Sequence, residues 1–133
     1  MLSPQYTAGL FDGEGCINIW MTKTGYCQIR ATLCMVEKPI IDMFKDSFGG
    51  CVTEIKKEND KWRDCWVWKC NGKDLMRFLE YIEPFCIVKK KQVAVGLKMR
   101  ELIGYSGRLI PEEIKDKRIE LKNEMHALNR RGK

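Results

Sequence analysis

The stretch that most constrains this chain lies near its start, where residues 7–15 read Thr-Ala-Gly-Leu-Phe-Asp-Gly-Glu-Gly. Ser3 and Pro4 precede it and predict the start of a helix, because a hydroxyl caps the first turn and proline suits the first helical position. Apolar residues at positions 8, 10 and 11 give that helix a surface to bury. The sequence therefore predicts a short helix that packs onto another element.

Two glycines leave one face of this helix open. Gly9 and Gly13 are four residues apart, so they share a face that lacks side chains. Such a face lets a second backbone approach closely. Gly13 and Gly15 are expected to end the helix, with the carboxylate of Glu14 between them. We therefore expect a tightly packed helix that places an acid at its end, directly before a strand.

The rest of the chain alternates between strand and helix patterns. Apolar and polar residues alternate over 16–22 and 26–35, which predicts a hairpin with one buried face and one polar face. Apolar residues at helical spacing predict the later helices. The expected order is the opening helix, strands at 16–22 and 26–35, a helix at 38–48, strands at 51–57 and 62–70, helices from 71 to Pro84 and at 89–103, and a C-terminal helix within 108–129.

The second hairpin is rich in tryptophan, and its facing is less clear from the sequence. We expect Trp62, Trp66 and Trp68 to face mainly the core, because they share a strand face with Cys70. Arg63 and Lys69 are then exposed. Contact of Trp66 or Trp68 with nucleic-acid bases remains an alternative.

The composition indicates what kind of partner the protein binds and in which cellular compartment it is expected. The 133 residues include 24 Lys and Arg against 18 Asp and Glu, a formal charge of +6 that favours a polyanionic partner such as nucleic acid. The sequence has seven cysteines, one histidine and no C-x-x-C pair, so no familiar zinc spacing can be assembled. We expect reduced, structural thiols in an intracellular protein of the cytoplasm, nucleoid or an organelle. No apolar run is long enough to span a membrane.

The nonapeptide resembles the signature of the LAGLIDADG homing endonucleases, with changes of types that the family tolerates. Thr7 stands for the first leucine, Phe11 for isoleucine, Gly13 for the second alanine and Glu14 for the second aspartate. Residues 84–92, Pro-Phe-Cys-Ile-Val-Lys-Lys-Lys-Gln, are similar to the P-F-L-x-x-K-x-x-Q segment of the same family. Together with the order of helices and strands, the resemblance covers nearly the whole chain.

This resemblance implies an α+β fold with an αββαββα core, C-terminal helices and an antiparallel sheet shaped like a saddle. A single domain would cover 1–133, with the core and following helix in 1–103 and the C-terminal helix in 108–129. One copy of the nonapeptide implies the single-motif, homodimeric type, in which two glycine faces meet across a twofold axis. The expected interface residues are Ala8, Gly9, Asp12 and Gly13, with Asp12 in a structural hydrogen-bonding role.

The chemistry expected of such a dimer is hydrolysis of one phosphodiester in each DNA strand. Magnesium or manganese would assist, because a divalent cation activates water and neutralises phosphate charge. Carboxylate and carbonyl oxygens suit Mg²⁺, and the resemblance implies Glu14 and the backbone carbonyl of Gly13 as its ligands.

Three further residues are candidates by position in the family pattern. Lys89 would be the active-site lysine that stabilises phosphate charge, and Gln92 a nearby polar residue. A solvated helix start is the alternative for residues 89–91, although positive charge at a helix N-terminus is mildly unfavourable and indicates an anion nearby. Glu37 stands where relatives often carry a water-positioning glutamine, and its role is open between positioning water, binding metal and beginning a helix.

The polar face of a twisted antiparallel sheet can lie along the DNA major groove, where each base pair presents a distinct pattern of donors and acceptors. An ordinary solvent-exposed face is the alternative, but exposed Trp20 and Tyr26 favour a covering ligand. The candidate DNA-binding residues are Asn18, Trp20, Thr22, Gln28, Arg30, Thr32, Arg63 and Lys69.

The leading hypothesis is a site-specific, double-strand DNA homing endonuclease that depends on a divalent metal. It would act as a homodimer on a long pseudo-palindromic site and leave short 3′ overhangs. One alternative is an RNA maturase, for which tight binding of intron RNA without duplex cleavage would be the mark. Another is a catalytically silent DNA-binding regulator, against which the presence of Glu14 and Lys89 argues.

Overall fold

The computed structural model describes residues 2–56, 58, 63–102 and 110–130. Its elements follow the expected order of helix, hairpin, helix, hairpin and helices. Two expectations lie outside the described residues: the facing of Trp62 and the end at residue 103 of the helix predicted over 89–103. No helix among the described residues has the length and apolarity needed to cross a membrane.

Helix α1 (Pro4–Glu14) begins as its sequence predicts. The Ser3 hydroxyl accepts a hydrogen bond from the Tyr6 amide at 3.2 Å, and Pro4 occupies the first helical position. Gly13 does not end the helix, because the last helical residue is Glu14 and the backbone becomes extended only at Gly15. The acid is therefore the last residue of α1, and the first strand follows without a linker.

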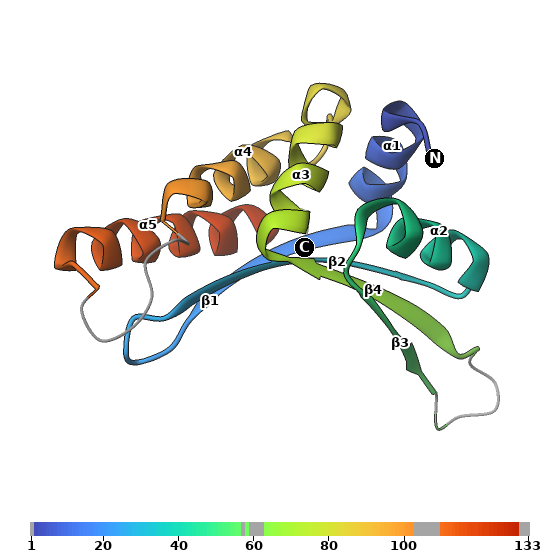
Figure 1. Cartoon of the computed structure of the whole chain (residues 1–133), viewed down its shortest axis with the longest axis horizontal. Helices are drawn as coiled ribbons and strands as arrows, with labels where there is room; N and C mark the ends of the chain where they lie inside the picture. Colours follow the sequence, from blue (N-terminus) through green and yellow to red (C-terminus); the bar gives the residue numbers. More distant parts are fainter. Residues whose placement is uncertain (1, 57, 59–62, 103–109, 131–133) are drawn as a thin grey trace.

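The strands form one four-stranded antiparallel sheet with the order β1-β2-β4-β3. The sheet arches so that its free face is concave, and the helices lie above the opposite face (Figure 1). This arrangement confirms the predicted α+β saddle. The strands are β1 (Gly15–Met21), β2 (Cys27–Met35), β3 (Cys51–Ile55) and β4 (Cys65–Asn71).

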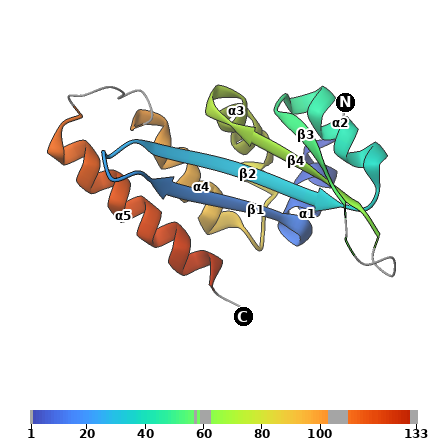
Figure 2. The ribbon, with the colours of Figure 1, turned by 90° about the horizontal axis from the view of Figure 1, so that it is seen from below.

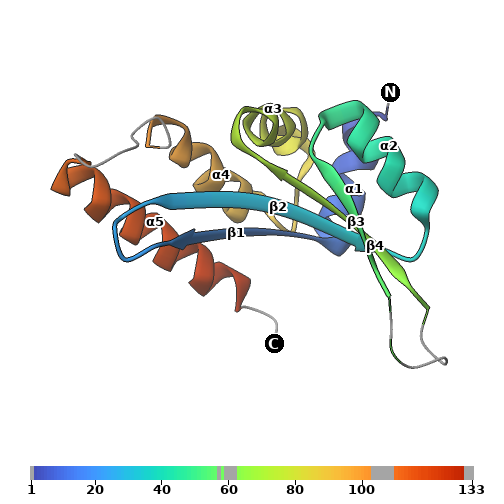
Figure 3. The same ribbon diagram turned by 60° about the horizontal axis from the view of Figure 1, so that its bottom comes forward.

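The described helices all lie on one side of the sheet, and none of them covers the other side (Figure 3). Helix α1 packs on α3, and α2 packs on β4. The remaining elements are α2 (Lys38–Phe48), α3 (Gly72–Ile82), the short turn η1 (Glu83–Phe85), α4 (Lys90–Lys98), the short turn η2 (Met99–Glu101) and α5 (Glu112–Asn129).

The core lies between the helices and the covered face of the sheet, and aromatic rings fill its centre. Phe78 packs edge-on against Phe11 and Trp68, with ring centroids 5.2 and 4.9 Å apart. Trp68 is fully buried and its indole donates a hydrogen bond to the Gly49 carbonyl at 2.8 Å. The prediction that this tryptophan faces the core is confirmed.

Helix α5 runs along the outer edge of β1 (Figure 2). One ring nitrogen of His126, Nε2, lies 3.0 Å from the Ile19 carbonyl, and Asn129 Nδ2 donates to the Ile17 carbonyl at 2.8 Å. Side chains of α5 thus occupy carbonyls that a further strand would otherwise bind. The sequence patterns did not indicate this contact, because its partners are more than 100 residues apart in the chain.

The buried side chain of Arg118 ties α5 to two other parts of the fold. Its guanidinium donates to the Gly25 carbonyl in the β1–β2 turn at 2.8 Å and to the Leu102 carbonyl after η2 at 3.2 Å. A buried cation is costly unless hydrogen bonds satisfy it. Arg118 therefore fixes the tip of the first hairpin against the C-terminal helices.

Candidate active site and nucleic-acid interface

The end of α1 is shaped by close packing between Phe11 and Gly15. A methyl group placed at Gly15 would lie only 2.2 Å from Phe11 Cδ1, so the ring occupies the space that any side chain would need. Phe11 is fully buried, and the backbone turns from helix to strand beside it. This packing places Glu14, whose side chain is exposed, at a fixed point where α1 meets β1.

The C-terminal end of α1 is negative and oxygen-rich. Helix dipoles place partial negative charge at this end, and the carboxylate of Glu14 adds a full charge there. The Phe11 carbonyl is taken by the Gly15 amide, and the Asp12 carbonyl by Lys89 Nζ. The carbonyl of Gly13 follows these two at the same end of the helix.

Asp12 joins α1 to the loop that leads into α4. Its carboxylate accepts hydrogen bonds from the backbone amides of Ile87, Val88 and Lys89 at 2.8, 3.3 and 3.0 Å. Amides at a helix N-terminus favour an anion, and α4 begins at the next residue, Lys90. Asp12 is the anion that the basic helix start indicates, and its hydrogen-bonding role lies within the chain.

Lys89 is held at the end of α1 by the same loop. Its ammonium donates to the Asp12 carbonyl at 2.7 Å, although the two residues are 77 apart in the sequence. An ammonium has three donors, so this contact leaves donors for another oxygen. Lys89 is half-buried and Glu14 is exposed. The structure thus brings the two principal candidate residues to the same end of one helix.

A buried thiol lies beneath this junction. The pKa of the Cys86 thiol is raised to about 12, mainly by burial. The negative charge of Asp12 and a hydrogen bond with its side chain also raise it. Lys89 acts weakly in the opposite direction. Burial likewise raises the pKa of Cys70 to about 12, so both thiols are neutral, structural groups near pH 7.

Gln92 and Glu37 lie on elements other than α1. Gln92 is half-buried on α4 and lines a groove with Ile87 and Val88. Glu37 is exposed at the residue before α2, without a side-chain hydrogen bond to that helix. It follows β2, whose Leu33 pairs with Gly15, so both Glu37 and Glu14 lie toward the same end of the first hairpin.

The glycine face of α1 is open in the single chain. A methyl group placed at Gly9 or Gly13 would meet nothing within 4 Å. Ile87 and Val88, held beside α1 by Asp12, are 83% and 72% exposed. Ala8, in contrast, is completely buried in the chain's own core. The prediction that Ala8 belongs to the interface is therefore wrong, because its helix face is already covered.

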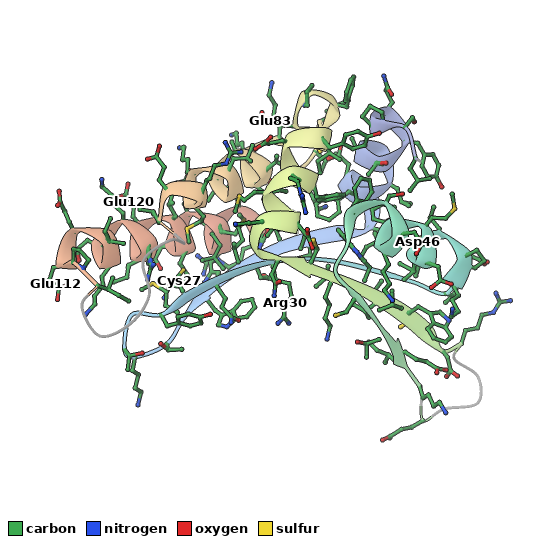
Figure 4. The ribbon with its side chains drawn as sticks, in the orientation of Figure 1. Cys27, Arg30, Asp46, Glu83, Glu112 and Glu120 are labelled. Carbon is green, nitrogen blue, oxygen red and sulfur yellow. The ribbon has the colours of Figure 1, made fainter. Side chains whose placement is uncertain are left out.

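The free face of the sheet gathers six of the eight candidate DNA-binding residues. Strand register pairs Asn18 with Arg30, Trp20 with Gln28, and Thr32 with Lys69. Because side chains alternate between faces, these positions share the face opposite Ile17 and Ile29, which are buried. Arg30 projects below the sheet, away from the helices (Figure 4).

Two candidate DNA-binding residues lie outside the strands. Thr22 follows β1, and its hydroxyl lies 2.8 Å from that of Thr24 and accepts a hydrogen bond from the Tyr26 amide. It thus shapes the turn, which alternation over 16–22 did not indicate. Arg63 is exposed two residues before β4.

One part of the free face is less open than the sequence predicts. Cys65 and Val67 lie on the strand face of Lys69, which the alternation predicts to be exposed, yet each is only 7% exposed. Cys34 of β2 covers them, since it pairs with Val67 and its thiol lies 3.1 Å from that of Cys65. Pairing between β2 and β4 joins residues far apart in sequence, so local alternation could not reveal this cover.

Comparisons with known proteins add independent information on the fold. No protein-family model matches the sequence, and no curated protein matches it. The homing endonuclease I-CvuI, solved with its DNA target in the presence of calcium, is similar over 98% of this chain and 83% of its own, with a TM-score of 0.75 and 20% identity. The archaeal intron-encoded homing endonuclease I-Vdi141I, solved with DNA, is similar over 98% and 86%, with a TM-score of 0.77 and 16% identity.

A longer structure is similar over only part of its length. The LAGLIDADG homing endonuclease I-GzeII, solved with its DNA target, matches 92% of this chain but 44% of its own, with a TM-score of 0.73 and 14% identity. The similarity to the two shorter proteins covers nearly the whole of this chain. The protein therefore has the fold of the LAGLIDADG homing endonucleases.

Proposed function

We propose that this protein is a site-specific DNA endonuclease that hydrolyses one phosphodiester in each strand as a homodimer. The observation that carries the proposal is the bond from Lys89 to the Asp12 carbonyl, which holds the lysine at the end of α1 that Glu14 also occupies, although Lys89 and Glu14 are 75 residues apart in the sequence. Glu14 would supply an oxygen ligand for a metal cation, and the Lys89 ammonium would bind the phosphate. A long pseudo-palindromic target and short 3′ overhangs are the expected consequences of a twofold assembly.

The end of α1 fits a divalent cation in chemistry but supplies few ligands. Glu14 and the Gly13 carbonyl are hard oxygen donors at the negative end of a helix, which suits Mg²⁺ or Mn²⁺. Such a cation, when bound, supplies water activation and charge neutralisation. In the described parts of the chain, no group of three or more His, Cys, Asp or Glu could hold a metal ion. Further ligands would come from DNA, water and a second copy of the chain.

The other residues of the site act through charge and position. The Lys89 ammonium stabilises the negative charge that develops on the phosphate, and its bond to the Asp12 carbonyl restricts its movement. Asp12 keeps the loop of Lys89 against α1. Gln92 from α4 and Glu37 from the residue before α2 would order water near the scissile bond.

A homodimer is supported by the surface beside the site. The open face at Gly9 and Gly13 adjoins Ile87 and Val88, two largely exposed aliphatic side chains. Apolar surface of this kind marks interaction sites. The match to less than half of I-GzeII agrees with a longer chain that holds two such units, where this chain would need two copies.

DNA is the substrate that the free face supports. The concave sheet presents Asn18, Gln28, Arg30, Thr32 and Lys69 without a covering helix, and the chain carries a formal charge of +6. These side chains can bind base edges and phosphates in a major groove. I-CvuI and I-Vdi141I were solved with DNA, which agrees with this choice of ligand.

The proposal is tested by selecting cleavage sites from a randomised DNA pool with Mg²⁺, and then comparing wild type with Glu14→Gln. Wild type should cut a defined site, and the variant should bind that site but lose cleavage by about 10²-fold or more, as expected for a group that acts in the transition state. Glu120→Gln, at an exposed acid of α5, is the matched control and should cleave normally.

Three outcomes would refute the proposal in different ways. Cleavage retained by Glu14→Gln removes the assigned role of that acid. If the wild type binds a defined duplex without cleaving it, the result supports a catalytically silent DNA-binding regulator. If it binds intron RNA tightly and cleaves no duplex, the result supports an RNA maturase.

A further inference from the structure

The free face of the sheet contains an arginine held by an aromatic ring. The guanidinium carbon of Arg30 on β2 lies 4.9 Å from the ring centroid of Trp20 on β1. The two residues are diagonal neighbours, because Asn18 pairs with Arg30 and Trp20 pairs with Gln28. A guanidinium over a ring face is attracted by the ring's quadrupole. The Trp20 ring therefore restricts the conformations that the Arg30 side chain adopts.

The same contact leaves the hydrogen-bonding capacity of Arg30 unused. Contact with a ring face consumes no N–H donor, and a guanidinium has five. In the described ranges of the chain, no hydrogen bond or ion pair engages the Arg30 guanidinium. Arg30 is half-buried and points away from the helices (Figure 4). Its donors are thus available to a ligand on the concave face.

A second cation–aromatic pair on the opposite face shows the contrast. Lys38 Nζ lies 5.1 Å from the Trp66 ring centroid, but it also forms an ion pair with Asp42 at 2.7 Å. That lysine is neutralised by a neighbour on its own helix, α2. Among the described residues, the Arg30 guanidinium is held by the Trp20 ring alone. This arrangement is expected of a group whose N–H donors bind an external acceptor.

We propose that Arg30 determines specificity by reading a guanine in each half-site, and that Trp20 is the positioning residue that orients it. The inference deepens the proposed function and rests on it. Arginine binds the O6 and N7 acceptors of guanine with two parallel hydrogen bonds, and such a contact discriminates between bases by roughly 10- to 100-fold. A ring that fixes the guanidinium plane reduces the freedom lost on binding.

Phosphate binding is the competing role for an arginine, and it makes different predictions. A phosphate contact contributes affinity without base preference and changes the salt dependence of binding. A base contact changes preference at one position. Arg30 lies on β2, one of the two inner strands, which is bonded on both sides by β1 and β4. This position is away from the edge strands of the sheet, which favours contact with bases over contact with phosphates.

The experiment measures base preference at every position of the target selected by the wild-type homodimer, using DNA pools in which one base pair is varied at a time. Arg30→Ala should lose a guanine preference at one position per half-site by about 10- to 100-fold. Arg30→Lys should keep the charge but lose most of that preference. Trp20→Leu should reduce the preference at the same position by about 2- to 5-fold, and Trp20→Phe, which keeps a ring, should restore part of it.

Trp66→Leu is the matched control, since it removes the other cation–aromatic ring from the covered face. It should lower stability without changing the base profile. A profile at that position unchanged in Arg30→Ala, or changed equally at all positions, would overturn the inference. So would a loss in Trp20→Leu at a different base pair from that lost in Arg30→Ala, which would mean that Trp20 contacts DNA by itself. If wild type selects no site, the proposed function fails instead.

Discussion

The two faces of α1 belong to the same eleven-residue helix but are built for different neighbours. One face buries Ala8 and Phe11 completely against the chain's own core. On the other face, a methyl group added at Gly9 or Gly13 would have no atom of the described residues outside its own helix within 4 Å. Residues one position apart in the sequence therefore meet opposite requirements, and a substitution that one face tolerates should be harmful on the other.

The comparison also shows how the site is assembled. The covered face anchors α1 through Phe11, whose ring fills the space above Gly15. The open face and the end of the helix then have fixed positions, and Asp12 uses three backbone amides to draw the loop of Lys89 alongside. Rigid packing on one side thus supports the exposed, chemically active groups on the other.

The largest effect should come from placing the same leucine on each face. Gly9→Leu meets open space in the single chain, so stability should hold while dimerisation weakens by roughly 30-fold or more, as for a residue at the centre of an interface. Ala8→Leu overfills the core and should cost about 1–3 kcal/mol of unfolding free energy. Sedimentation and urea unfolding measure the two quantities. A dimer that persists in Gly9→Leu would rule out this face as the interface.

Asp12→Asn tests the bridge between the two faces. An amide cannot accept from all three backbone donors, and its NH₂ group would oppose one of them, so about 1.5–3 kcal/mol of unfolding free energy should be lost. Cleavage should fall as well, because the loop of Lys89 is released. Asp46→Asn, at an exposed acid of α2, removes a charge without these bonds. Equal stability of the two variants in urea would contradict the bridging role.

Alanine at Gly15 and at Gly13 sharpens the comparison at the helix end. Gly15→Ala forces the Phe11 ring to shift and should destabilise the fold by about 1–3 kcal/mol. Gly13→Ala enters open space within a helix, so it should stabilise the single chain by about 0.5–1 kcal/mol while weakening the dimer. Thermal unfolding at low concentration separates these effects. Destabilisation by both variants would mean that the two positions are packed alike.

The smallest effect concerns the thiol beneath the covered side. Burial first, and then Asp12, raises the pKa of Cys86 to about 12 in the folded chain, above the ordinary value that it regains on unfolding. The unfolded chain therefore binds fewer protons above about pH 9, so the contribution of this thiol to stability is complete below that pH and is lost toward pH 12. Alkylation at pH 8 should modify exposed Cys51 well before Cys86, followed by mass spectrometry. Equal rates would contradict the burial of Cys86.

Much of the fold could be predicted because its signals are local. Alternation places Ile17 and Ile29 in the core and Arg30 outside, and Ser3 with Pro4 begins α1 as expected. The placement of Ala8 at the interface was wrong because Ala8 lies on the covered face of α1. Ala8 and Phe11 are three residues apart, and that spacing already puts them on one face.

The remaining features depend on contacts between distant segments. Asp12 receives amides from residues 75–77 positions away, and Arg118 binds the turn at Gly25 from 93 positions away. No local residue pattern in a single sequence indicates hydrogen-bond partners that are so far apart. Asn71 was likewise missed as a neighbour of Arg30 on the free face, since the pairing of β2 with β4 brings them together.

The cover that α5 gives to β1 has a consequence for how copies of this chain can associate. The outer strands of the sheet are β1 and β3, and His126 and Asn129 already occupy carbonyls along the first of them. Growth of a sheet from molecule to molecule needs two available borders, as in a fibre. With carbonyls of β1 occupied, β3 is the border that the described strands leave for such pairing, so a single chain cannot extend a sheet in both directions.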